Sequence, residues 1–374
     1  MKKWAIVPVM GALWVVGLTY ASGIGQAYDI YGKTKLVTIG IFLFMFIFRG
    51  KFHRISLKML GVLAIMVVGC TVTYIRFDRN VANYLWVYLL IPLIALLPVE
   101  KAQMRLVALM YGMLGGAVLF LANYGSVFRG WNPNSVGMIA FFSYMVFIGS
   151  FSEVRNKRAI FVLVVYSLVY FSWLEILDAR SSALFSIAAF LCVFSIIPLR
   201  SIVRVKQFLP LVLLASLILA IVVVLIRDTP IDAALNLWSL ELFKKPIFNG
   251  RERIWAWGFR DWWKVPLFGN GTLDGNFHNS AVTMLYGCGA VGFVVWISGT
   301  RNMLRRGLAH LDDSVIYGLM IAFLMIWLQQ SLELGLVASQ ANVVPYGILG
   351  LLLGRVKTLE SKDGEKIIDH NSGI

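Results

Sequence analysis

Charge is scarce in this sequence of 374 residues: only 14% of the residues are charged, whereas 59% are hydrophobic. A soluble domain carries about 25% charged residues. A chain with so little charge is unable to hide its apolar residues in one water-soluble core. Apolar runs of roughly 17–22 residues recur instead, and this length matches the hydrocarbon core of a bilayer. The composition excludes an ordinary soluble enzyme and predicts an all-α polytopic membrane protein.

Cysteine is also rare, with three residues in the whole chain. Cys70, Cys192 and Cys288 lie within apolar runs or at their ends, so we interpret them as small core residues. Their spacing is not that of a disulfide framework or a cysteine metal site. We expect neither a metal nor a cofactor.

The net charge of +15 does not indicate a nucleic-acid partner, because the Lys and Arg residues lie in short loops between apolar runs, where they set membrane orientation. We predict about 12 transmembrane helices. Their approximate limits are residues 4–22, 30–48, 57–75, 83–99, 104–123, 134–151, 159–176, 181–199, 207–226, 279–299, 314–332 and 335–354.

The cations are concentrated on alternate loops, such as 49–58 and 200–206. The positive-inside rule places those loops and both termini in the cytoplasm. The N-terminal run resembles a signal peptide, but we interpret it as a retained first span, because the alternation of charge is consistent with keeping it. We therefore treat 1–374 as a single integral membrane domain ending in a polar, flexible cytoplasmic tail, 355–374.

One long loop, 227–278 between spans nine and ten, then faces outward. Its residues 250–264 are predicted to form an amphipathic helix lying in the membrane interface. One face carries Trp255, Phe259 and Trp262, and another carries Arg253, Trp257, Arg260 and Lys264. The glycines that follow, Gly269, Gly271 and Gly275, permit close approach of the backbone to a ligand.

His278 is the one histidine that this topology places outward; His53, His310 and His370 are cytoplasmic. An imidazole can accept a proton near neutral pH, as a general base must. The alternative is a histidine at headgroup level that caps the following helix.

Two outward arginines, Arg180 and Arg251, are candidate ligands of a diphosphate, because the guanidinium fork matches phosphate oxygens. The alternative is an interfacial anchor for each of them. Trp131, Asn132 and Asn134 are candidate sugar contacts, or simply the turn that starts the sixth span. Glu175, Asp178 and Glu333 lie near outer span ends, and the lack of a relay of charges at mid-bilayer depth disfavours an ion-coupled transporter.

His278-Asn279 is followed after nine residues by Gly289 and after two more by Gly292. This spacing resembles the motif of the O-antigen ligases and related polysaccharide polymerases. Gly250-Arg251, Trp255, Pro266 and Gly269 resemble the long outer loop of that family, and Arg180-Ser181 resembles its outward arginine. The resemblance covers roughly residues 130–295.

The resemblance implies a glycosyltransferase of the bacterial inner membrane, active on its outer face without metal or nucleotide. It would move a glycan from undecaprenyl diphosphate to an acceptor hydroxyl with inversion, using His278 as base and Arg180 and Arg251 on the diphosphate. Arg253, Arg260 and Asn279 are further candidate substrate contacts.

The acceptor separates the family members. A polymerase uses a second lipid-linked glycan to build O-antigen, capsule or exopolysaccharide, whereas a ligase uses lipid A-core. The stretch from Trp131 to Asn134 and the compact loop look more like a polymerase, which we favour. A chain-length regulator is a further expected partner, besides membrane lipid. A transporter or flippase of lipid-linked glycans is the alternative from another class.

Overall fold

The structure, a computed structural model, describes residues 5–21, 40, 86–125, 131–151, 156–194, 199–205, 207–273, 275–337 and 342–371. Within these residues every regular element is a helix, which confirms the all-α class. The helices are α1 (Ile6–Ala21), η2 (Trp86–Leu89), α6 (Leu90–Ile94), α7 (Lys101–Tyr124), α8 (Pro133–Gly149), α9 (Lys157–Ile176), α10 (Arg180–Val193), α11 (Leu199–Val203), α12 (Phe208–Ile226), α13 (Pro230–Phe243), α14 (Arg251–Trp263), α15 (Ser280–Leu308), α16 (Ser314–Gln329) and α17 (Val343–Asn371). The predicted spans 30–48 and 57–75 lie outside the described residues, apart from residue 40, so the number of about 12 spans stays a prediction.

Helices α7, α9, α12 and α15 are each long and apolar enough to cross a membrane, and α1, α8, α10 and α16 are shorter apolar helices. Helices α9 and α12 expose large apolar side chains, among them Phe161, Leu168, Leu211 and Leu225. An apolar surface of this extent is unusual in water but suits contact with lipid chains. These helices together indicate a multi-pass membrane protein.

The centre of the bundle is formed by α8 and α16, because both are apolar on all sides. Every residue of α8 from Val136 onward is buried, and so is nearly all of α16. The two helices cross where Gly149 meets Gly318, and a Cβ atom on Gly318 would overlap the carbonyl of Gly149. Small residues at such a crossing let the backbones approach closely, as in other membrane bundles.

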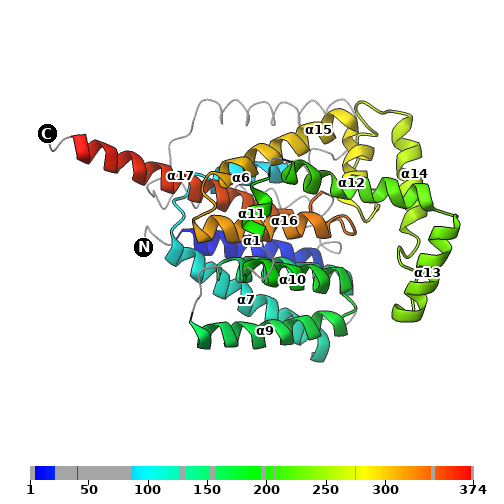
Figure 1. Cartoon of the computed structure of the whole chain (residues 1–374), viewed down its shortest axis with the longest axis horizontal. Helices are drawn as coiled ribbons and strands as arrows, with labels where there is room; N and C mark the ends of the chain where they lie inside the picture. Colours follow the sequence, from blue (N-terminus) through cyan, green and yellow to red (C-terminus); the bar gives the residue numbers. More distant parts are fainter. Residues whose placement is uncertain are drawn as a thin grey trace.

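Figure 1 shows α7, α9, α10, α12 and α16 running in similar directions, with both chain termini at one end of the bundle. Helices α13 and α14 lie across this direction at the opposite end (Figure 1). Helix α14 packs against α12 and α15. The predicted long loop is therefore a helical layer that covers one end of the bundle.

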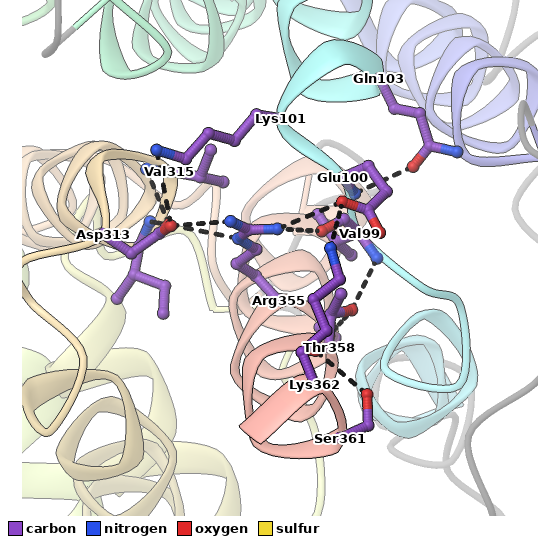
Figure 2. Close-up of polar contacts among 12 residues, drawn as sticks. Val99, Glu100, Lys101, Gln103, Asp313, Val315, Arg355, Thr358, Ser361 and Lys362 are labelled. Carbon is purple, nitrogen blue, oxygen red and sulfur yellow. Dashed lines mark hydrogen bonds and ion pairs between the residues drawn. The ribbon is translucent and has the colours of Figure 1, made fainter. Parts of the chain in front are cut away.

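A cluster of charges ties three segments together at the end that carries the termini (Figure 2). The Arg355 guanidinium, only 5% exposed, donates to Asp313 Oδ2 at 2.7 Å and to the Val99 carbonyl at 2.9 Å. Glu100 lies 3.6 Å from Arg355 and 3.1 Å from Lys362. Burial alone would raise the pKa of Asp313, but the hydrogen bonds and charge of Arg355 outweigh it and hold that pKa below its usual value.

We expect acid to weaken the bundle through Asp313. A lowered carboxyl pKa contributes stability that is present above the unfolded-state value of 3.8 and is lost as the pH falls through the folded-state value. Replacing Asp313 with Asn keeps an acceptor for the start of α16 but removes the charge, which is expected to cost about 1–3 kcal/mol at neutral pH. Thermal unfolding of both proteins, from neutral pH to below 3.8, measures this. Equal acid sensitivity of the two proteins would contradict the role of Asp313.

The tail after Arg355 differs from the sequence prediction. The sequence predicts a flexible segment, whereas α17 continues as a helix to Asn371. Thr358 explains the start of this extension, since its hydroxyl accepts a hydrogen bond from the Val99 amide at 3.0 Å. The first turns of the tail are thus docked on the bundle.

Candidate functional site

The candidate site lies at the end of the bundle opposite the Arg355 cluster. Helix α16 connects the two ends: it begins beside Asp313 and ends 16 residues later at Gln329, just before Glu333. The start of α10 reaches the same end, because Ser182 accepts a hydrogen bond from Gln329. The start of α8 lies beside it, because Gly137 packs against Ala179. The tertiary fold therefore gathers Arg180, His278 and Glu333 at one end, although they are far apart in sequence.

The backbone at the start of α15 fixes the position of His278. His278 adopts a left-handed conformation with φ of 48°, which is uncommon for a residue other than glycine. The next residue, Asn279, is fully buried and accepts hydrogen bonds from the amides of Ala281 and Val282. This N-cap fixes the backbone directly after His278.

The amide of Asn279 also bridges neighbouring segments. Its Nδ2 donates to the carbonyls of Ser216 at 3.0 Å and Ser331 at 2.9 Å. Both donors and the acceptor of the side chain are thus used within the protein. These hydrogen bonds give Asn279 a positioning role, while the substrate contact that the sequence suggested stays a prediction.

We expect Asn279→Ala to remove four hydrogen bonds, two with the carbonyls of Ser216 and Ser331 and two with the amides of Ala281 and Val282. The loss is expected to lower stability by about 1–3 kcal/mol. Thermal unfolding of the purified protein measures it, with Asn236→Ala as control, because Asn236 bonds only within and just after exposed α13. Equal losses in the two variants would argue against a special role for Asn279.

Glu333 brings two of the predicted site residues together. Its Oε2 lies 3.7 Å from His278 Nδ1, and its Oε1 lies 3.5 Å from the Arg251 guanidinium. The carboxyl is only 13% exposed, so these contacts occur in a partly dehydrated setting. Sequence reasoning noted Glu333 only as an acid near a span end. The one available signal was its position directly after the predicted span 314–332.

A second carboxylate holds the other predicted arginine. Asp178 Oδ1 accepts a hydrogen bond from Arg180 Nε at 2.9 Å, and Asp178 Oδ2 pairs with Lys245 from the long loop. The hydrogen bond from Lys245 and the charges of both cations lower the pKa of Asp178. Lys245 is therefore a basic residue beside Arg180 that sequence reasoning did not single out.

A chain of polar side chains runs between the two carboxylate clusters. Ser182, two residues after Arg180 in α10, accepts a hydrogen bond from Gln329 at 3.4 Å, and Gln329 accepts one from Gln330. Ser280 then joins Gln330 to the backbone carbonyl of Glu333, with distances of 3.5 and 3.4 Å. The chain fixes the starts of α10 and α15 relative to the end of α16.

The other predicted contacts lie around this centre. Asn132 accepts a hydrogen bond from the Asn134 amide and caps α8, and both side chains are exposed, while Trp131 packs partly against the core. Arg253 and Arg260 are exposed on α14. The structure places these five residues at the same end of the bundle but gives no contact between them and His278.

The predicted apolar face of α14 packs against protein. Trp255 is fully buried and donates from Nε1 to the Phe277 carbonyl at 2.6 Å. It packs with Ala220 and Val223 of α12 and with Val282 of α15. Through Phe277, the residue before His278, α14 supports the position of the imidazole.

The glycines of the motif allow a loop to pack directly against the backbone of α15. Gly289 has φ of 66° and ψ of −172°, which breaks the helix. The amide of Gly271 donates to the Gly287 carbonyl at 2.9 Å, and the amide of Ala290 donates to the Pro266 carbonyl at 2.8 Å. Gly269 and Gly289 are packed so closely that neither has room for a Cβ atom. The backbone at Gly269 therefore approaches the backbone of α15 closely. The close approach to a ligand that the sequence suggested stays a prediction.

The geometry provides one potential base, and three cations paired with Asp178 or Glu333, at a single end of the bundle. His278 has a carboxylate beside Nδ1, and Arg180, Lys245 and Arg251 supply positive charge partly balanced by Asp178 and Glu333. Nowhere in the described residues do three His, Cys, Asp or Glu side chains form a group suited to a metal. No protein-family model matches the chain, and no curated protein matches its sequence.

Proposed function

We propose that this protein is a membrane glycosyltransferase that moves a glycan from undecaprenyl diphosphate to a sugar hydroxyl of another lipid-linked glycan, as a polysaccharide polymerase. The observation that carries the proposal is the meeting of His278 and Arg251 at the Glu333 carboxylate. The transfer reaction requires a base that deprotonates the acceptor hydroxyl. It also requires a cation nearby that stabilises the diphosphate leaving group.

His278 acts as the general base. A carboxylate facing Nδ1 favours the tautomer that carries its proton on Nδ1, which leaves Nε2 to accept a proton. The acceptor hydroxyl gives its proton to Nε2 as its oxygen forms a bond to the anomeric carbon of the donor. Glu333 then stabilises the resulting imidazolium, as the carboxylate does in other His–carboxylate pairs.

The cations act on the leaving group. The bond between the anomeric carbon and the diphosphate oxygen breaks, its electron pair remains on the diphosphate, and the anomeric centre is inverted. Arg251 and Arg180 bind and stabilise this developing charge. Glu333 orients Arg251 but also offsets part of its charge, so Arg180 supplies a necessary second cation at the site.

The apolar bundle agrees with a lipid-linked donor, since the substrate's polyprenyl chain requires a site within the membrane. We place the protein in a bacterial inner membrane, with both termini in the cytoplasm and His278 at the outer face, on the basis of the charge bias of the loops. The acceptor glycan, and a chain-length regulator, are the partners that this function implies.

Reconstitution tests the proposal. The purified protein is placed in vesicles with lipid-linked glycan extracted from its own source cells, and the products are resolved by size. A ladder of increasing length is the expected result. Transfer only after addition of lipid A-core would instead identify a ligase. Bound donor that crosses the vesicle membrane without forming any product would contradict an enzyme and favour a transporter.

A further inference from the structure

The turn that follows α14 carries an unusual cluster of exposed apolar side chains. Trp263 is 73% exposed and Phe268 is 70% exposed, and Val265 and Leu267 between them are also exposed. Four large apolar residues exposed within six positions would be costly in water. This segment, residues 263–268, is called the apolar turn below.

The backbone of the apolar turn is held rigidly despite its exposure. The carbonyl of Pro266 accepts from Ala290, the carbonyl of Leu267 accepts from Val291, and the Trp262 indole donates to the Pro266 carbonyl, at 2.8–3.1 Å. Non-helical backbone is tolerated next to hydrocarbon only where its polar groups have such partners. The turn therefore presents side chains outward while its hydrogen bonds are made inward to α15.

The position of the turn along α15 sets its level in the membrane. Ala290 and Val291 are the first residues after the break at Gly289. Helix α15, which as a whole is long and apolar enough to cross a membrane, continues from there to Leu308. On that continuation Val291, Val294 and Val295 are exposed. The apolar turn is thus continuous with the exposed apolar side of a spanning helix, at its beginning.

We propose that residues 263–268 form a membrane anchor that inserts Trp263, Val265, Leu267 and Phe268 into the boundary between lipid headgroups and acyl chains. Its partner is the hydrocarbon of the surrounding bilayer lipid. Elements of this type insert roughly 5–10 Å. Lys264, paired with Asp261 at 2.7 Å, extends from the turn to the headgroup level. Since the turn directly follows α14, whose Trp255 donates to the carbonyl of Phe277 next to His278, the anchor holds the layer that carries His278 against the membrane.

Chemical labelling from the lipid phase and from the water tests the anchor in the unmodified protein. Vesicles contain a phosphatidylcholine with a photoactivated diazirine in its acyl chain, and hydroxyl radicals are generated in the water. We expect diazirine insertion into the peptide with residues 263–268 at a level comparable to that with Val294 and Val295. We also expect loss of aqueous oxidation at Trp263, while Trp257, which is 42% exposed on the same helix, stays oxidised.

Two results would overturn the inference. Oxidation of Trp263 at the rate of Trp257, without diazirine insertion, would place the turn in water. Absence of both modifications would show that protein, from this chain or a second copy, covers the turn. Neither result depends on glycan transfer, so the anchor and the proposed enzymatic activity stand or fall separately.

Discussion

Replacing His278 with Asn is expected to abolish glycan transfer while leaving donor binding and the fold intact. Asn tolerates the left-handed backbone of this position, so the variant removes the imidazole without adding strain. Loss of a general base typically slows a reaction about 10²–10⁴-fold. The measurement is the rate of product formation in reconstituted vesicles, together with donor binding by the same preparation.

His310→Asn provides a matched control, because His310 lies beyond the end of α15 at the opposite end of the bundle from His278. That variant should keep the rate of the unaltered protein. Retention of full transfer by His278→Asn would remove the catalytic role of the imidazole. Loss of donor binding together with transfer would assign His278 to the binding of the donor instead.

Replacing Gly289 with Ala is expected to prevent stable folding of the layer that carries the site. With φ of 66° and ψ of −172°, Gly289 lies in a region that only glycine adopts readily. A Cβ atom there would come within 2.3 Å of the Leu267 carbonyl oxygen, and that oxygen is fixed by its bond to Val291. Backbone strain and overlap together are expected to cost more than about 3 kcal/mol.

Gly299→Ala is the control for this prediction, because Gly299 lies in the same helix with no atom within 4 Å of an added Cβ. Alanine there is expected to be neutral or stabilising by up to about 1 kcal/mol. Thermal unfolding of the detergent-solubilised proteins compares the two variants. Similar stability of both would show that α15 can straighten through Gly289 and release the loop at little cost.

Much of the helical architecture could be predicted from apolar run length. The predicted spans 104–123, 159–176 and 207–226 agree closely with α7, α9 and α12. These helices satisfy their own backbone hydrogen bonds, and lipid requires this of every exposed span. Their limits are therefore local properties of the sequence. The helical extension of α17 beyond Arg355 escaped prediction because it depends on docking against Val99 and Glu100.

The candidate site could be predicted only in part. His278, Arg180 and Arg251 were recognisable from their residue types, spacing and expected side of the membrane. Their carboxylate partners, Asp178 and Glu333, were visible only as acids near span ends. His278 and Glu333 are 55 positions apart in the sequence. At that separation, a sequence pattern does not indicate which acid contacts which base. Lys245 was indistinguishable from other loop cations for the same reason.

The sequence by itself determined that this is a helical membrane protein, because hydropathy is a linear property of the chain. It also determined the spacing of His278, Gly289 and Gly292 for the same reason. The tertiary structure decided which contacts these residues make. It turned Asn279 into a cap with four hydrogen bonds, and Gly289 into a break that a loop enters. It also placed Glu333 between His278 and Arg251. These outcomes depend on packing between segments distant in the chain, and no local pattern encodes such contacts.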